Sequence, residues 1–162
     1  MTLTPAQKTT LKNYILNDSI LNAFPNNSDG SVEIANRLNL TASPNFTVWR
    51  TSISKSEIHS DSSFAWIEID NLTAGQYRIW EQIFIDGMLN PNQLNVRAGI
   101  SECWKGTANK VAVATAVLQK CKRNATVFEK IFATGTGSDT SPATIILESP
   151  IIYQDVEIAR NS

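Results

Sequence analysis

Apolar positions along the chain recur mainly at spacings of three and four residues, which is the spacing of a helix that buries one face. The first such helix is predicted to begin after Thr4, whose hydroxyl is a good N-cap, with Pro5 at the first helical position. Leu11 and Ile15 continue its apolar face, and we expect it to end near Asn17. The start of the chain therefore predicts an amphipathic helix.

Turn-forming residues divide the next thirty positions into short elements. We expect a turn over 19–24, a loop over 25–30, and a helix that begins at Ser31 and buries Val32, Ala35 and Leu38. The Ser43-Pro44 dipeptide closes this helical region, because a residue before proline avoids the helical conformation.

The helical spacing returns at Thr73 and continues to Thr134. Four groups of apolar positions mark four helices: Tyr77, Trp80, Ile83 and Phe84; Val96, Ile100, Cys103 and Trp104; Val111, Ala114, Thr115, Leu118 and Cys121; and Phe128, Ile131 and Phe132. The links between the last three are short, so we expect these helices to pack as neighbours. The core predicted from these faces contains Trp80, Phe84, Ile100, Trp104, Leu118, Phe128 and Ile131.

Extended structure is predicted at only a few places. Val48–Arg50 and Ile145–Leu147 are rich in β-branched or aromatic residues, and we expect these two short strands to pair with each other. Residues 66–70 alternate between apolar and acidic side chains, which indicates either a further short strand or an extended link. Ser54 and Glu57 have the spacing of a capping box, which predicts one capped helical turn.

Length and composition indicate one folded domain. The chain has 162 residues, of which 42% are hydrophobic and 18% charged, so it is able to bury a core. It contains no internal repeat and no break in composition, and the segment after Pro150 fits either an extended piece or a short helix. We therefore predict a single, mainly α-helical domain over residues 1–162, with a small two- or three-stranded β element.

The charge pattern excludes some classes of partner. The net charge is −1, and 45 of the 162 residues are Asn, Ser or Thr, so the surface is expected to carry amides and hydroxyls more than charge. A nucleic-acid binder that depends on bulk positive charge is not expected. No apolar run approaches the roughly 20 residues of a membrane span, and no secretory leader is visible. We expect a protein made in the cytoplasm, with no membrane partner.

Residues that catalyse reactions or bind metals are sparse. Cys103 and Cys121 occupy apolar helical positions and are predicted to be buried, reduced thiols. The single histidine, His59, is predicted to lie exposed at a helix end, and no Gly-x-Ser-x-Gly elbow accompanies the many serines. Glu68 and Asp70 would share one strand face without a third ligand. We expect no enzyme activity, no bound metal and no cofactor.

One segment is more basic than the rest of the chain. Residues 101–133 contain two acidic side chains, Glu102 and Glu129, and six basic ones, which gives a local net charge of +4. The basic residues are Lys105, Lys110, Lys120, Lys122, Arg123 and Lys130. This segment is either a binding face for phosphates or an acidic partner, or a set of lysines on solvated helix faces.

Two further features are candidate contact residues. Trp49 and Arg50 are of the residue types that are common at binding hot spots, and Trp49 is either a core residue or an interface anchor. Residues 133–142 are predicted to form a flexible loop without an apolar anchor. Gly135 and Gly137 resemble part of a phosphate loop, but the Gly-Lys-Ser/Thr ending is missing. We expect this loop to contact a neighbouring protein, with Ile145, Ile146 and Phe132 supplying apolar surface.

Five stretches, spread over most of the length of the chain, are similar to a group of proteins from tailed bacteriophages and prophages. They are Leu3–Gln7 with Leu11-Lys12, Ala42-Ser43-Pro44 with Val48–Thr51, Asn95–Ile100, Lys122–Thr126 and Phe132–Gly137. Proteins of this group resemble products of the virion-assembly part of phage genomes. The small helical connectors of the head–tail junction are the class nearest in size and helix content.

The resemblance implies a structural subunit of the virion that is made in the cytoplasm of the host bacterium. It implies a head–tail connector or adaptor that forms a symmetric homo-oligomer. Its partners would be neighbouring phage structural proteins, with DNA as a further candidate. The alternative is a small phage-encoded protein that binds a host defence complex or nucleic acid, with the basic segment as its contact surface.

Overall fold

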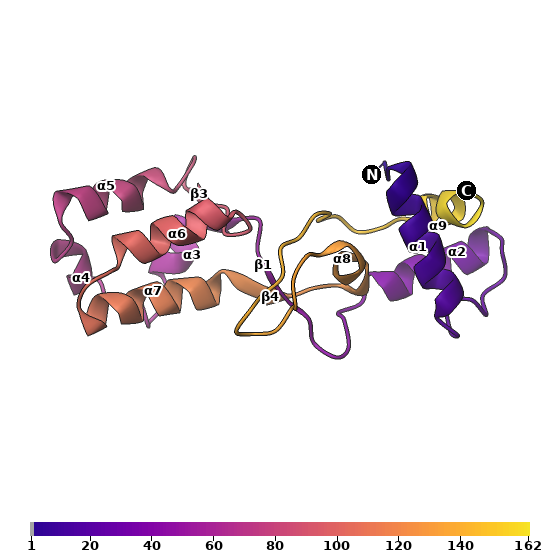
Figure 1. Ribbon diagram of the computed structural model, residues 1–162, viewed down its shortest axis with the longest axis horizontal. Coiled ribbons are helices and arrows are strands. Elements are labelled where there is room, and N and C mark those ends of the chain that lie inside the picture. The colour runs from indigo at the N-terminus through magenta and orange to yellow at the C-terminus, as the bar shows by residue number, and fades with distance from the viewer. Residues whose placement is uncertain (1) are drawn as a thin grey trace. The chain divides into compact units, whose positions relative to one another are not determined.

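The computed structural model describes residues 2–162 and confirms a mainly α-helical fold with little sheet (Figure 1). Within this range the chain forms nine helices and two two-stranded sheets. In chain order the elements are α1 (Pro5–Asn17), α2 (Ser28–Leu38), β1 (Thr47–Trp49), β2 (Ile53–Ser54), α3 (Lys55–His59), α4 (Ile67–Asp70), α5 (Ala74–Gln82), β3 (Met88–Leu89), α6 (Leu94–Cys103), α7 (Ala108–Lys120), β4 (Lys122–Asn124), α8 (Val127–Phe132) and α9 (Tyr153–Arg160).

The chain divides into two compact units. Unit 1 contains the residues up to Phe46 together with Asn124–Ser162, and unit 2 contains Thr47–Arg123. A single domain in the thermodynamic sense requires that both units unfold in one cooperative transition. The single domain over residues 1–162 therefore stays a prediction.

Unit 1 is built from both ends of the chain. Helix α9 contacts α1 and α2, and α8 contacts the same two helices; in Figure 1 the indigo α1 and the yellow α9 lie side by side. The amide of Asn39 donates to the carbonyl oxygen of Ile151 at 2.8 Å, and its Oδ1 accepts from the backbone N–H of Ile151 at 3.0 Å. The core of unit 1 contains Leu3, Leu11, Ile15, Leu21, Ile34, Ala35, Leu38, Phe128, Phe132, Ile151, Val156 and Ala159.

Side-chain caps set the starts of the first two helices. The predicted start and end of α1 are confirmed: Thr4 Oγ1 accepts from Gln7 N–H at 3.3 Å, and Gln7 Oε1 accepts from Thr4 N–H at 2.8 Å. Helix α2 begins three residues earlier than Ser31, because Asn27 is its N-cap and accepts from Gly30 N–H at 2.9 Å. The predicted loop over 25–30 is therefore wrong at its last three residues.

The buried face of α2 differs from the prediction at one position. Ala35 and Leu38 are buried as expected, but Val32 is exposed, and Ser31 and Ile34 face the core instead. Residues 28–30 add one turn to the helix, and the apolar spacing by itself did not indicate this turn.

Unit 2 has an aromatic centre. Helix α5 packs against α6, α6 against α7, and α4 also contacts α7 (Figure 1). The rings of Trp80 and Trp104 are fully buried, with centroids 5.2 Å apart in an edge-to-face arrangement, and Phe64 meets Trp104 edge to face at 5.8 Å. The core of unit 2 contains Ile53, Ile58, Phe64, Trp80, Leu89, Ile100, Cys103, Trp104, Val113, Ala114, Val117 and Cys121.

The residues of the predicted core are buried or partly buried, but they belong to two clusters. Those in unit 2 are Trp80, Phe84, Ile100, Trp104 and Leu118. Phe128 and Ile131 lie on α8 and belong to the core of unit 1, where α8 contacts α1 and α2. The expectation that all helices between 91 and 134 pack consecutively holds for α6 and α7 and is wrong for α8.

The buried face of α7 is also shifted. Val113, Ala114 and Val117 face the core, whereas Val111, one of the apolar positions that marked this helix, is exposed. Apolar residues occupy most positions between 111 and 118, so several helical faces satisfy the same spacing.

The structure corrects the predicted pairing partner of the first strand. Strand β1 forms as expected, but it pairs with β4, and Arg50 N–H donates to the carbonyl oxygen of Cys121 at 2.8 Å. The predicted pairing with Ile145–Leu147 is wrong, because that segment has no regular secondary structure. Strand β4 consists of lysine, arginine and asparagine, so strand propensity gave no reason to choose it.

Two short segments resolve alternatives left by the sequence. Residues 66–70 are neither a strand nor an extended link: they contain helix α4. The capped turn at Ser54 is confirmed as the start of α3, where Ser54 Oγ accepts from Glu57 N–H at 3.0 Å. The segment after Pro150 forms the short helix α9.

Replacement of Trp80 by alanine tests the aromatic centre of unit 2. We expect Trp80→Ala to lower the free energy of unfolding by about 3–5 kcal/mol, because a fully buried indole leaves a cavity among packed rings. Ile67→Ala, at a side chain that is 72% exposed, is the control and should change stability by less than about 0.5 kcal/mol. Urea titration followed by far-UV circular dichroism measures both. An unchanged unfolding midpoint for Trp80→Ala would contradict this packing.

Candidate functional site

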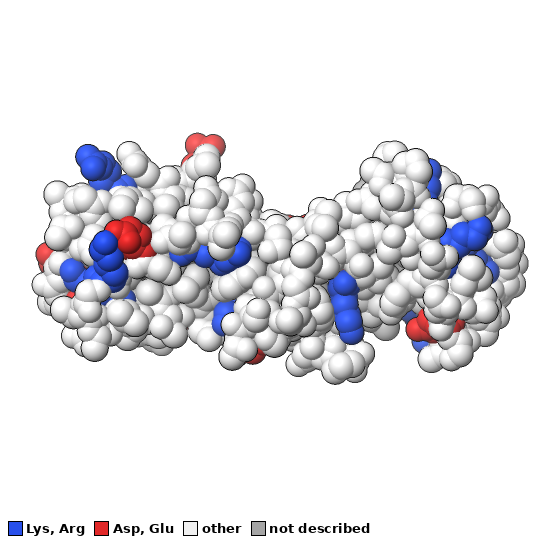
Figure 2. Space-filling view, in the orientation of Figure 1, with Lys and Arg blue, Asp and Glu red and all other residues white. Residues whose placement is uncertain are grey.

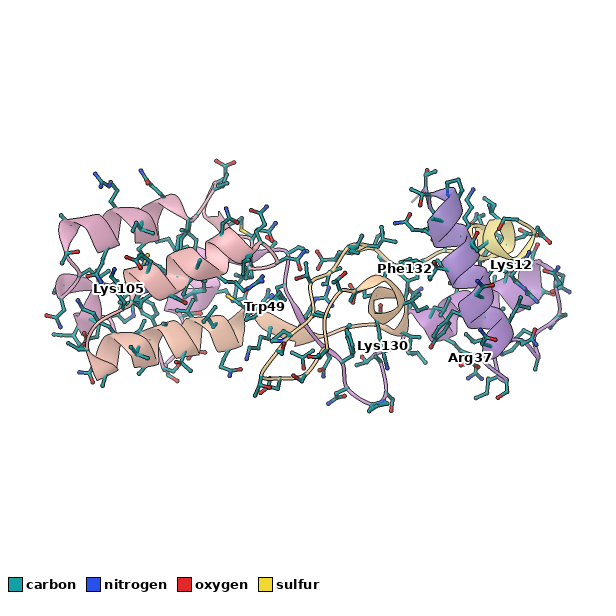
Figure 3. The ribbon with its side chains drawn as sticks, viewed as in Figure 1. Lys12, Arg37, Trp49, Lys105, Lys130 and Phe132 are labelled. Carbon is teal, nitrogen blue, oxygen red and sulfur yellow. The ribbon has the colours of Figure 1, made fainter. Side chains whose placement is uncertain are left out.

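Trp49, on β1 in unit 2 (Figure 3), has two cationic side chains near its ring. The guanidinium of Arg97 lies 4.7 Å from the ring centroid of Trp49, and Nζ of Lys122 lies 5.8 Å from it. Arg97 Nη1 also donates to the carbonyl oxygens of Pro91 at 2.6 Å and Asn92 at 3.0 Å, and burial lowers its pKa. Three of the five stretches that carry the phage resemblance therefore meet at Trp49.

Arg50 is paired inside unit 2. Its guanidinium donates to both carboxylate oxygens of Glu57, at 2.5 and 3.1 Å, in a bidentate ion pair. This hydrogen bonding holds the pKa of Glu57 below its ordinary value. Arg50 therefore joins the end of β1 to α3 through Glu57. Its role as a contact residue for a partner stays a prediction.

The other basic residues of the predicted positive segment also have intramolecular partners. Lys105 pairs with Glu102, Lys110 donates to the carbonyl oxygen of Asn71 at 2.6 Å, and Lys120 lies 2.5 Å from Asp61. Lys122 and Arg123 are likewise engaged within the chain. Hydrogen bonds from Lys120 and Ser63 lower the pKa of Asp61. Lys105 and Lys120 are thus paired with carboxylates, and Lys110 is held by a backbone carbonyl.

Lys130 completes the predicted segment but lies in unit 1. Its Nζ lies 5.6 Å from the ring centroid of Phe46 (Figure 3). Figure 2 shows a face that is mostly uncharged, with basic and acidic groups scattered among other side chains. The basic residues of this segment are therefore divided between the two units.

The glycine loop of residues 133–142 has an apolar anchor, so the expectation that it lacks one is wrong. Gly137 is buried against Phe46 at a φ of +66°, and a Cβ on Gly137 would lie 2.2 Å from Cε2 of that ring. Thr134 and Thr144 exchange two backbone hydrogen bonds of 2.9 and 2.8 Å, which join the ends of the loop. Gly135 also has a positive φ, beside Ala143.

The apolar flank of this loop is only partly as predicted, since Phe132 is 9% exposed and belongs to the core of unit 1. Ile145 is only 5% exposed and belongs to the buried set, so it offers little surface to a partner. Its neighbour Ile146 is 60% exposed. If this loop contacts another protein, Ile146 is the side chain that supplies the apolar contact.

His59 is the last residue of α3, as predicted, but it is half-buried in the aromatic cluster of unit 2 instead of exposed. Its ring centroid lies 4.7 Å from those of Phe64 and Trp66, and 6.1 Å from that of Trp80. Its Nε2 is buried, and no hydrogen-bond partner for it is found in residues 2–162. Burial lowers the pKa of His59, and the charge of Lys55 lowers it further, while Glu81 opposes the shift.

The residues that were weighed for catalysis are not brought together. The hydroxyl of Ser63 donates to Asp61 rather than to His59. Glu68 is buried and accepts from Asn71 Nδ2 and Asn109 Nδ2, each at 3.3 Å, whereas Asp70 is exposed. The shared strand face predicted for the two carboxylates is therefore wrong, because both lie on the helical turn of α4.

Metal and membrane sites were sought in the described part of the chain. Residues 2–162 contain no group of three or more His, Cys, Asp or Glu side chains arranged to hold a metal ion. No helix in this range has the length and apolarity that crossing a membrane requires.

Sequence reasoning missed a shallow groove in unit 1. It has a volume of about 320 Å³ and is lined by Phe24, Pro25, Asp29, Gly30, Val32 and Glu33. The sequence did not indicate this groove, because part of its lining comes from the first turn of α2, which was predicted to be a loop. The pair Asp29 and Glu33, four residues apart, is the signal that could have indicated one charged helical face.

Comparison with known proteins gives no relative for this chain: no family model, no curated protein and no solved structure matches it.

The single histidine predicts how stability depends on pH. The folded state binds a proton at His59 less readily than the unfolded chain, since burial lowers its pKa below the ordinary 6.5. Its contribution is complete above pH 6.5 and is lost as the pH falls from there toward the folded-state pKa. We expect the urea midpoint to fall between pH 7.5 and 5.5, and His59→Phe to abolish most of this fall. An equal fall in the variant would contradict the assignment to His59.

The two cysteines give a chemical test of burial. Both are free and buried, and burial raises the pKa of Cys103 and of Cys121 to about 12. We expect neither thiol to react with Ellman's reagent at pH 8 in the native protein, and two thiols to react after unfolding in urea. Rapid reaction of either thiol in the native protein would show that its surroundings are open.

Proposed function

We propose that the protein is a structural subunit of a tailed-phage virion, of the head–tail connector type, which assembles into a symmetric homo-oligomer. The phage lineage rests on the resemblance of five stretches of sequence. The proposed partners are further copies of the chain and neighbouring phage structural proteins, and the proposed location is the virion. The role involves no catalytic step and no cofactor.

The observation that carries the proposal is the exposed apolar surface of both units. The large apolar side chains exposed on unit 1 are Leu16, Ile20, Val32, Leu40, Ile146, Ile152, Tyr153 and Ile158. Those exposed on unit 2 are Trp66, Ile67, Tyr77, Ile85, Met88, Leu94 and Val111. Leu94 and Ile85 are 73% and 75% exposed. Scattered apolar side chains are ordinary on a monomer, and these side chains offer apolar area that contacts with other subunits would bury.

Opposite net charges on the two units give further support. Unit 1 contains five basic and eight acidic residues, for a net charge of −3, and unit 2 contains nine basic and seven acidic residues, for a net charge of +2. A head-to-tail contact between copies joins two different surfaces and closes into a ring when the rotation per subunit allows it. Surfaces of opposite sign on one chain favour such a contact over a like-with-like dimer.

The alternative, a binder of a host defence complex or nucleic acid, depends on the basic segment. Lys105, Lys110 and Lys120 are occupied by partners within the chain, and a nucleic acid would have to compete for them. DNA as a partner draws its only support from the same residues. The structural-subunit proposal does not need this competition and is therefore preferred.

Mass spectrometry of purified phage particles tests this proposal. We expect the protein in the particle at a fixed copy number, in proportion to known ring components, because a ring holds a set number of subunits. Non-structural proteins of the same phage, quantified in the same sample, control for contamination from the lysate. Absence from particles, together with presence in infected cells, would overturn the virion role and favour the host-directed alternative.

A further inference from the structure

Few charged side chains of this protein lack a partner, and this makes the exceptions informative. Of the arginines in residues 2–162, only Arg78 has no hydrogen bond, ion pair or ring contact within the chain. It lies exposed on α5, next to Tyr77, which is exposed as well. Arginine and tyrosine are both residue types enriched among the hot spots of protein interfaces.

A complementary pair of carboxylates lies on α2. Asp29 and Glu33 are exposed, and neither side chain forms a hydrogen bond or ion pair within the described residues. They are four residues apart, so both project from one side of the helix. Together with Phe24, Pro25 and Val32 they line the groove of about 320 Å³ in unit 1.

Contacts within unit 1 fix the residues that line the groove. Arg160 Nη1 and Nη2 donate to the carbonyl oxygens of Pro25 and Phe24, each at 2.9 Å. Gly30 allows the Pro25 carbonyl to approach α2, since a Cβ at this position would lie 2.0 Å from that oxygen. Arg37 lies over the Phe24 ring, 5.3 Å from its centroid. The wall of the groove therefore exists before any partner binds, which lowers the entropic cost of binding.

We infer that this groove receives Tyr77 and Arg78 from a second copy of the chain. The inference rests on the proposed function and names the contact through which the oligomer forms. The planar guanidinium of Arg78 offers paired N–H donors to Asp29 and Glu33, and the ring of Tyr77 lies on the apolar wall of Phe24, Pro25 and Val32. Each side supplies what the other lacks: an unpaired cation and an unpaired carboxylate pair, each with apolar surface beside it.

Charge complementarity is what selects a second copy as the occupant. The groove belongs to the acidic unit 1, and Arg78 belongs to the basic unit 2. Lys8 is another cation with no side-chain partner in the described residues, but it lies in unit 1 and lacks both the planar fork of arginine and an exposed aromatic neighbour. The contact joins two different surfaces, so repetition extends it head to tail from copy to copy.

Charge reversal on each side of the contact tests this inference. The donor variant is Arg78→Glu, and the groove variant combines Asp29→Asn with Glu33→Arg. We expect each variant alone to weaken self-association of the purified full-length chain at least tenfold, as measured by sedimentation equilibrium. Asp70→Arg, which reverses an exposed carboxylate outside the groove, is the matched control and should assemble like the original protein. Far-UV circular dichroism checks that every variant is folded.

Mixing the two variants gives a result that general destabilisation cannot produce. The donor variant keeps the acidic groove, which can still receive Arg78 of the groove variant. The glutamate that replaces Arg78 in the donor variant can in turn pair with the arginine that replaces Glu33 in the groove variant. We therefore expect an equimolar mixture, and also the chain carrying all three substitutions, to recover self-association.

Two outcomes overturn the inference: variants that assemble like the original protein, or folded variants whose mixture stays as dissociated as each alone. A monomeric original protein also overturns it. In each case, detection of the protein in phage particles would leave the virion role standing, because that measurement does not depend on which surfaces join the copies.

Discussion

The structure depends on the return of the C-terminal segment onto the N-terminal helices. Helix α9 packs against α1 and α2, and the paired hydrogen bonds between Asn39 and Ile151 fix where the returning chain lies. The residues that meet are more than a hundred positions apart, so closing this contact restricts a long loop. Unit 2 folds within that loop around its own aromatic core, which shortens the effective span to be closed. The same return brings Arg160 to the carbonyls of Phe24 and Pro25, so the groove on α2 exists only in the closed unit.

Features with a local cause could be predicted from the sequence. Thr4 and Ser54 begin helices because a hydroxyl three residues before a backbone N–H satisfies that donor, whatever the rest of the chain does. Trp80 and Trp104 lie in the core as predicted, because both fall on the apolar faces of consecutive helices, where a large ring is buried. The mainly helical class follows from the same spacing rule repeated along the chain.

Features that depend on distant partners could not be predicted. Strand β4 pairs with β1 although its residues disfavour strands, and the β-branched run at Ile145–Leu147 stays irregular. The candidate site shows the same limit: Lys120 counts as a free positive charge in the sequence, but its partner Asp61 lies 59 positions earlier. A count of charges along the sequence cannot distinguish paired from unpaired groups. Nor does the sequence show that His59 lies among aromatic rings, because these rings come from other parts of the chain.

Compensation within the chain also determines how electrostatics act between copies. At physiological salt, interactions between exposed charges are screened beyond about 8 Å, so the net charges of the units contribute little to attraction at a distance. What remains is contact between the few groups without partners inside the chain, such as Arg78, Asp29 and Glu33. Charge pairs of this kind fix register and exclude wrong partners more than they add affinity, which comes from buried apolar area. The surface is rich in Asn, Ser and Thr and exposes isolated apolar residues, so most of it carries no charge that would repel a misaligned neighbour. The specificity of contacts between copies therefore depends on a small number of charged side chains.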